Sequence, residues 1–250
     1  MGRVKNLLAT GKVGNLVFYE YRGKECVRTA PGTIKQTAGM KKNSSRFGLA
    51  VRASAYIRAS MGRIFHDEKD KAMLYGFNAA INKWLREYKI NADTFSASNF
   101  YIDNFQFNTA APMSMLLKKP VSARFSNTGA ITVDVPELIP GIDIIAPPGT
   151  VQVHYRACVT GCELCFKTNY CTLVNPVRRD KRAVGIVLEY GKQPLPSQKM
   201  SLYIQQEKSA LVVVAFSIQY EVRKGDVLEM VTDKSWWPVS VVGSCFGQNS

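Results

Sequence analysis

The residues of this sequence whose type and spacing could best support metal binding or redox chemistry are four closely spaced cysteines: Cys158, Cys162, Cys165 and Cys171. The pair Cys162 and Cys165 has the spacing of a zinc knuckle. An extended strand would separate Cys158 from Cys162 by about 13 Å, at about 3.3 Å per residue. Both could therefore ligate one zinc ion only if Thr160 and Gly161 form a turn. Only five residues separate Cys165 from Cys171, which is a short connection to a further zinc ligand. Zinc binding is therefore the alternative here and not the expectation.

The first three of these cysteines also have the C-x3-C-x2-C spacing that holds an iron–sulfur cluster in radical enzymes that use adenosylmethionine. That chemistry needs a long α/β barrel after the motif, whereas the 85 residues that follow Cys165 have the pattern of antiparallel strands. Disulfides require an oxidising compartment, which the start of the chain does not indicate. We expect instead that the cysteines fill core positions of β-strands as small hydrophobic side chains, with no metal bound.

The two histidines of the chain, His66 and His154, have no arrangement of nucleophile, base and orienting group around them in the sequence. The sequence also contains no G-x-G-x-x-G, no G-x4-G-K-[ST] and no H-E-x-x-H motif. We therefore expect a protein that is not an enzyme, with no catalytic residues and no cofactor.

Charge is concentrated in the first part of the chain. The protein has 33 Lys+Arg and 19 Asp+Glu, a net charge of +14. Residues 1–90 hold 18 basic and 6 acidic side chains, a net of +12, whereas the remaining 160 residues hold 15 and 13, a net of +2. Such a one-sided positive field attracts nucleic acid, anionic lipid or an acidic protein.

The periodicity of residues 33–88 predicts two helices. In the first, apolar and small residues recur at spacings of three and four: Phe47, Ala50, Val51, Ser54, Ile57 and Met61. Four basic side chains fall on the opposite side and are the predicted partner-binding residues: Lys41, Lys42, Arg52 and Arg63. After a charged break at 66–69, Asp70 is the expected N-cap of the second helix. The apolar residues of that helix are Leu74, Phe77, Ile81, Trp84 and Leu85.

Strand patterns occupy the rest of the chain. Residues 12–30 predict a β-hairpin with its turn at 22–24, and residues 121–125 and 131–135 predict a second hairpin. Further strands are predicted at 151–159, 163–174, 183–190, 200–205, 210–222, 226–232 and 238–246. The predicted fold class is α+β: an N-terminal β-hairpin and two-helix basic module, followed by an antiparallel β-sandwich. We expect this module at 1–90, a linker or junction at 91–112 and the β-sandwich domain at 113–250, with 100–250 soluble by itself.

The longest apolar run, at 210–216, is too short to span a membrane. The first residues have no uninterrupted apolar segment, so no signal peptide is predicted and we expect a cytoplasmic protein or a component of a larger assembly. The basic module also contains five aromatic residues, which either stack on bases or pack as core. They are Phe18, Tyr19, Tyr21, Phe47 and Tyr56.

The residues of the first hairpin carry a resemblance to a known family. Its motif comprises GKVGNLV at 11–17, then Gly23-Lys24, Val27-Arg28 and Pro31, followed by KQT at 35–37 and Arg46-Phe47. This pattern resembles a group of uncharacterised Bacteroidetes proteins that begin with such a hairpin and continue into a basic helical segment. Those proteins end in an immunoglobulin-like β region. The resemblance is specific over about 40 residues and implies a bacterial source and this fold outline, with no activity.

These observations favour a non-enzymatic structural or assembly protein whose basic N-terminal module contacts a partner, either another protein or a second copy. The alternative is a nucleic-acid-binding protein that grips phosphates through the basic helix face. The sequence contains neither an RNP1 strand nor a helix-turn-helix spacing.

Overall fold

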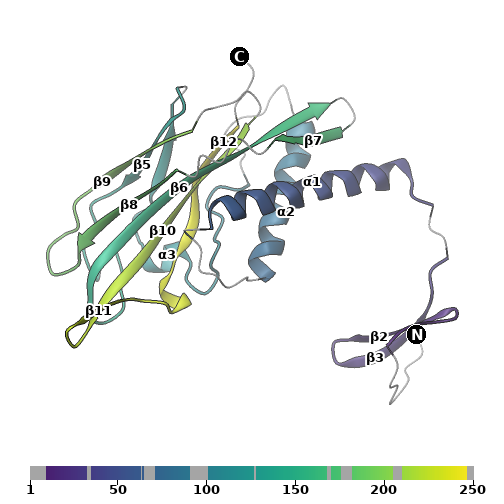
Figure 1. Ribbon diagram of the computed structural model, residues 1–250, viewed down its shortest axis with the longest axis horizontal. Coiled ribbons are helices and arrows are strands. Elements are labelled where there is room, and N and C mark those ends of the chain that lie inside the picture. The colour runs from purple at the N-terminus through teal and green to yellow at the C-terminus, as the bar shows by residue number, and fades with distance from the viewer. Residues whose placement is uncertain are drawn as a thin grey trace. The chain divides into compact units, whose positions relative to one another are not determined.

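The chain divides into two compact units, Met1–Lys42 and Asn43–Ser250 (Figure 1). The computed structural model describes residues 10–32, 35–62, 64, 71–90, 101–126, 128–167, 170–175, 182–204 and 210–246. The fold is mixed, with a small N-terminal sheet, two long helices and two further antiparallel sheets, so the predicted α+β class is confirmed. The division falls inside the first helix, Ala38–Ser60. The expected domains at 1–90 and 113–250, with a junction at 91–112, stay a prediction.

The first unit contains a three-stranded antiparallel sheet where the sequence predicted a two-stranded hairpin. Its strands are β1 (Gly11–Val13), β2 (Leu16–Tyr21) and β3 (Lys24–Thr29), in the order β1-β2-β3. The two-residue turn between β2 and β3 has positive φ at both positions, 53° at Arg22 and 70° at Gly23. This is the type I′ geometry whose twist matches that of the flanking strands.

Both predicted helices are present, as α1 (Ala38–Ser60) and α2 (Lys71–Ile90). The buried residues of α1 are Leu49, Ala50, Ala53, Ser54 and Ile57. Two members of the predicted apolar stripe do not belong to it, because Phe47 is 52% exposed and Val51 is half-buried. The predicted N-cap, Asp70, and the charged break at 66–69 lie outside the described residues.

The second unit contains a six-stranded and a three-stranded antiparallel sheet. In the six-stranded sheet, β10 lies between β6 on one side and both β11 and β12 on the other, and β7 and β8 both pair with the far side of β6. The three-stranded sheet has the order β4-β5-β9. The strands are β4 (Ser122–Phe125), β5 (Ala130–Val135), β6 (Thr150–Lys167), β7 (Tyr170–Asn175), β8 (Arg182–Glu189), β9 (Gln198–Tyr203), β10 (Ala210–Lys224), β11 (Val227–Met230) and β12 (Val239–Phe246).

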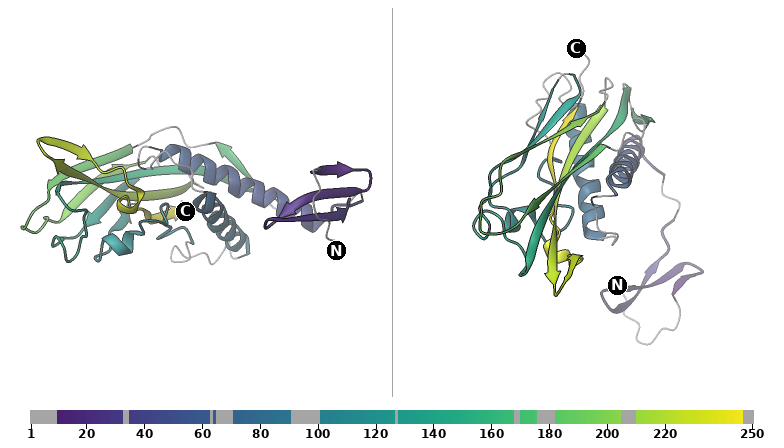
Figure 2. Two further views of the ribbon diagram at one scale, coloured as in Figure 1. Left: turned by 90° about the horizontal axis from the view of Figure 1, so that it is seen from below. Right: turned by 60° about the vertical axis from the view of Figure 1, so that its left-hand side comes forward.

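The six-stranded sheet is covered on both faces. One face packs against the three-stranded sheet, with alternating residues of β10 such as Val212, Val214 and Phe216 in the shared core. The other face packs against α1 and α2, through the intervening residues Leu211, Val213 and Ala215. Figures 1 and 2 show the two helices on one side of this sheet and β4, β5 and β9 on the other. A strand that is covered on both faces is apolar at nearly every position, which accounts for the continuous run in β10.

A short helix, α3 (Met113–Leu116), and a 3-10 turn, η2 (Lys234–Trp236), complete the regular elements described. Among the helices that the structure describes, none combines the length and apolar character needed to cross a membrane.

Candidate partner-binding surface

The N-terminal sheet has two chemically different faces, which follow from its register. Directly paired residues of antiparallel strands project to the same side, and neighbours along a strand alternate. The pairs Val13–Leu16 and Phe18–Val27 thus share one side, which we call the apolar face; its other members are Glu20, Glu25 and Thr29. The opposite side, which we call the basic face, carries Lys12, Val17, Tyr19, Tyr21, Lys24, Cys26 and Arg28.

On the basic face, cations lie against the tyrosine rings. The guanidinium of Arg28 lies 5.6 Å from the ring centroid of Tyr19, and that of Arg22, in the turn, lies 5.2 Å from the ring centroid of Tyr21. Both distances are within the range of a cation–π interaction. Tyr21 is 57% exposed, so its ring and the cation beside it are accessible to a partner. This face therefore presents cationic side chains that lie over tyrosine rings.

The apolar face is not enclosed in a core. Val13 is 61% exposed and Leu16 is 44% exposed, while Phe18 and Val27 are half-buried. No described residue between 10 and 48 is buried. A single layer of three short strands gains little from its own packing, because a stable sheet buries one face against a second layer.

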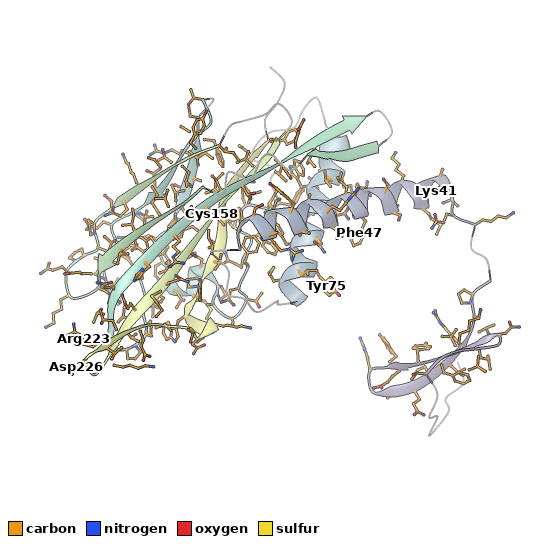
Figure 3. The ribbon with its side chains drawn as sticks, in the orientation of Figure 1. Lys41, Phe47, Tyr75, Cys158, Arg223 and Asp226 are labelled. Atoms are coloured by element: carbon orange, nitrogen blue, oxygen red, sulfur yellow. The ribbon has the colours of Figure 1, made fainter. Side chains whose placement is uncertain are left out.

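Three of the four predicted binding residues lie on α1 and are exposed: Lys41, Lys42 and Arg52. At about 100° and 1.5 Å per residue, Lys41 and Arg52 lie within about 20° of each other around the helix and about 17 Å apart along it. Lys42 is turned by about 100° from Lys41 and leaves that stripe. Arg63 lies outside the described residues. Lys41 is labelled near the start of α1 in Figure 3.

Other arginines on α1 are engaged within the helix. Arg46 donates from Nη2 to Oδ1 of Asn43 at 2.9 Å, and Arg58 donates from Nε to the hydroxyl oxygen of Ser54 at 3.3 Å. Burial lowers the pKa of Arg58 below its ordinary value. Arg58 therefore belongs to the helix packing, in contrast to Lys41 and Arg52.

The cysteines do not form the turn that a zinc site would need. β6 continues through Thr160 and Gly161, both paired with β10, so Cys158 and Cys162 lie four residues apart along one strand. Both are buried in the core between the sheet and the helices, as predicted for small hydrophobic side chains (Figure 3 labels Cys158). The side chains of Cys165 and Cys171 lie outside the described residues, and the described residues contain no group of three metal-ligating side chains.

Of the remaining candidate groups, the structure describes His154 and Cys245. Nε2 of His154 lies 3.3 Å from Oε2 of Glu221 on the neighbouring strand, and both side chains are largely covered. His66 lies outside the described residues. Burial raises the pKa of the Cys245 thiol to about 12, and the nearby Asp103 carboxylate adds to this shift, so the thiol stays protonated at neutral pH.

A cavity of about 330 Å³ lies beside α3 and β12. Its lining includes Asn104, Gln106, Met113, Ser114, Leu117, Lys118, Lys119, Pro120, Val121, Ser240 and Val242. Oε1 of Gln106 accepts from the backbone N–H of Met113 at 2.9 Å, and Nζ of Lys119 lies 2.7 Å from Oδ2 of Asp143. That ammonium holds the pKa of Asp143 below its usual range. These contacts hold the segment before β4 in place.

Sequence reasoning named the tyrosines of the first hairpin but did not separate its two faces. The signal was present as an alternation of two, since Leu16 and Phe18 point one way while Val17, Tyr19 and Tyr21 point the other. The basic residues of β3 then fall on the tyrosine side by register.

No family model matches the chain, and a search among curated proteins finds no match.

Proposed function

We propose that this protein is a non-enzymatic assembly protein that contacts an acidic surface of a protein partner through its N-terminal unit. The observation that carries this proposal is the basic face, on which Lys12, Lys24 and Arg28 accompany two tyrosines. Residues 1–42 hold nine Lys+Arg and two Asp+Glu, a net of +7. Accessible charge of one sign accelerates encounter with a partner of the opposite sign. The four residues that the sequence predicts as partner-binding, Lys41, Lys42, Arg52 and Arg63, stay a second proposed contact.

The alternative is a single-stranded nucleic acid, for which the exposed ring of Tyr21 is the favouring observation. Bases stack on exposed aromatic rings while cations hold the phosphates. However, the guanidinium groups of Arg22 and Arg28 already lie over the rings of Tyr21 and Tyr19. A base would stack on the outer side of a guanidinium plane or displace that group from the ring, whereas a carboxylate binds the N–H groups at the guanidinium edge and leaves the ring contact in place. We therefore place the acidic protein first, and the salt-dependence test below separates the two partners.

Two further points stay part of the proposal. We propose that the chain belongs with the Bacteroidetes proteins that its hairpin motif resembles, and that it works in the cytoplasm or within a larger assembly. The motif at 11–17 supports the first point, and the accessible charge of the N-terminal unit supports the second.

The test measures binding of the full chain to a polyglutamate peptide and to a single-stranded oligonucleotide as the salt concentration is varied. The test variant replaces Lys12, Lys24 and Arg28 by Ser. A matched variant replaces Lys192, Lys199 and Arg223 by Ser. These three residues are exposed on the second unit, so the matched variant loses the same amount of positive charge. We expect polyglutamate binding to weaken about tenfold in the test variant and no more than about twofold in the matched variant.

Equal weakening in both variants would mean that net charge alone drives binding, and it would contradict the proposal. Much tighter binding of the oligonucleotide than of polyglutamate, with a steep salt dependence that the test variant reduces, would establish the alternative.

A further inference from the structure

We infer that the cavity beside α3 and β12 is a binding site for a small aliphatic carboxylate, held by the ammonium of Lys118 and the hydroxyl of Ser240. The residues that line the cavity all belong to the second unit, so this inference is independent of the function proposed for the N-terminal unit. The cavity volume of about 330 Å³ is near the lower end of the range for ligand pockets, about 300–1,000 Å³. A small ligand therefore suits it.

One wall of the cavity is built by two paired segments. Residues 104–107 run along β12 and are joined to it by backbone hydrogen bonds of 2.8 to 3.0 Å. Side chains alternate along such a pair, so one set packs toward the helices and the other set faces the cavity. The second set is Asn104, Gln106, Ser240 and Val242. Oε1 of Gln106 accepts from the N–H of Met113 at 2.9 Å, which ties this wall to α3.

Ser240 brings a buried polar group to the cavity. It is only 3% exposed, and its hydroxyl makes no hydrogen bond to any residue that the structure describes. A buried hydroxyl without a hydrogen bond destabilises the folded state, so proteins pair such groups with protein, water or ligand. Because Ser240 lines the cavity, a ligand bound there can supply the acceptor for this hydroxyl.

The charge of the lining points to an anion as that ligand. The lining carries two lysines and no carboxylate side chain. Nζ of Lys119 is 2.7 Å from Oδ2 of Asp143, which is not part of the lining, whereas no described acidic side chain forms an ion pair with Lys118. Lys118 is exposed and has a flexible four-carbon stem, so its ammonium can follow a bound anion.

The rest of the lining selects an aliphatic body for this anion. Its apolar members are Met113, Leu117, Pro120, Val121 and Val242, and the lining contains no aromatic side chain. Nucleobases are commonly held by stacking on aromatic rings, whereas a hydrocarbon chain needs only apolar surface. One unpaired ammonium and one hydroxyl also match a single carboxylate better than a phosphate, which binds arginine forks or several backbone N–H groups.

The experiment follows the methyl resonances of the full chain by NMR as hexanoate is added, with 1-hexanol as the uncharged probe of equal length. We expect the resonances of Met113, Leu117 and Val242 to shift, with a Kd on the order of 1 mM for so small a ligand. Hexanol should bind at least about fivefold more weakly, because it lacks the charge that Lys118 binds. Butanoate should bind about fifteenfold more weakly than hexanoate, at about fourfold per methylene.

Two variants test the polar contacts separately. Lys118→Gln should raise the Kd of hexanoate at least about fivefold and change that of hexanol less than about twofold, since only the acid uses the charge. Ser240→Ala should raise the Kd of hexanoate at least about threefold by removing the hydroxyl donor. The matched variant is Lys192→Gln, which removes an exposed cation of the second unit outside the lining and should change the Kd less than about twofold.

The methyl spectrum also reports whether each variant is folded, and Lys118→Gln keeps the test decisive if Ser240→Ala disturbs the packing. Shifts confined to residues outside the lining, equal binding of acid and alcohol, or equal weakening by the changes at Lys118 and Lys192 would overturn the inference. Tighter binding of N-acetyl-Gly-Leu than of hexanoate would also overturn it, because the site would then take a peptide terminus and not a free acid. None of these results involves the N-terminal unit, so the polyglutamate test of the basic face is unaffected.

Discussion

The two units of this chain carry the same net charge on very different amounts of protein. The first 42 residues hold nine basic and two acidic side chains, and the other 208 hold 24 and 17, so each unit has a net charge of +7. The second unit places its apolar side chains in two continuous cores, whereas no described residue from 10 to 42 is buried. The comparison indicates that the second unit is held together by its own packing, and it supports the proposal that the first unit serves as a contact surface.

Charge is also used differently in the two units. In the second unit, acidic partners lie beside cations, as in the pairs Arg124–Asp134 at 2.8 Å and Lys224–Glu229 at 2.9 Å. In the first unit, the guanidinium groups of Arg22 and Arg28 lie over tyrosine rings. A cation over a ring keeps its charge available to an incoming anion.

Two truncations give the largest expected difference between the units. Starting the chain at Ala38 removes the N-terminal sheet, and we expect the melting temperature to stay within about 2 °C because none of the described residues before Ala38 is buried. Starting it at residue 100 removes both helices and exposes the apolar side chains of β10 and β12 that face them. We expect that second fragment to aggregate, as judged by light scattering, although the sequence alone predicted that it would be soluble. A soluble, cooperatively folding 100–250 fragment would show that the helices are an appendage and not part of the core.

Within the second unit, substituting one buried and one exposed aromatic residue of α2 tests which side of this helix belongs to the core. Phe77 is fully buried, with its ring centroid 4.9 Å from that of Phe105 and 5.0 Å from that of Phe107. We expect Phe77→Ala to lower the free energy of unfolding by about 4 kcal/mol, as is typical when a buried aromatic side chain is removed. Tyr75, which is 67% exposed and labelled in Figure 3, provides the matched control, and Tyr75→Ala should cost less than about 0.5 kcal/mol. Urea unfolding measures both, and similar losses would contradict the placement of α2 on the sheet.

Alanine substitution of one turn glycine in each unit gives a second comparison of their stability. Gly129, between β4 and β5, has φ 84°, and a methyl group there would collide with the carbonyl oxygen of Ile204. We expect Gly129→Ala to cost about 3 kcal/mol, from backbone strain and the collision together. Gly23 has φ 70°, but a methyl group there meets no atom within 4 Å. Gly23→Ala should therefore weaken amide protection in β2 and β3 while leaving the melting temperature of the second unit unchanged. A fall in that melting temperature would mean that the two units unfold as one.

Much of the fold could be predicted because the local patterns are strong. The strand predicted at 210–222, which contains the apolar run at 210–216, corresponds to β10, and the spacing of Phe77, Ile81 and Trp84 corresponds to the buried side of α2. The strand predicted at 163–174 differs, because β6 continues to Lys167 and β7 begins at Tyr170. The sequence at 158–162 is compatible with either a turn or a strand, because it contains glycine between two cysteines. The segment forms a strand because it pairs with β10.

Other features depend on contacts between distant segments. Phe47 has the spacing of a core residue, but it precedes the stretch of α1 that reaches the sheet, so it stays exposed. Charge pointed to the N-terminal part of the chain and to four cations at 41–63, whose role stays a prediction, but it did not single out the basic face of the sheet. The register of β2 with β3 places Arg28 beside Tyr19, and a local pattern does not specify that register.

The smallest expected effect on stability belongs to the predicted binding residues on the helix. Replacing Lys41, Lys42, Arg52 and Arg63 by Ser should change the melting temperature by less than about 2 °C, because the first three are exposed and exposed charges contribute little to stability. Changing Arg58 to Ser instead should lower it measurably, since Arg58 is half-buried and donates to Ser54. Differential scanning calorimetry measures both effects.

The same fourfold variant also shows how far the contact surface extends beyond the sheet. If α1 shares the partner contact, polyglutamate binding weakens further when this variant is combined with the serine changes on the basic face. Lys41 and Arg52 lie on one line of the helix and Lys42 does not, so restoring Lys41 and Arg52 together should recover more binding than restoring Lys42 alone. Unchanged binding in the fourfold variant would confine the contact to the N-terminal sheet and leave the helix cations as a solvated surface.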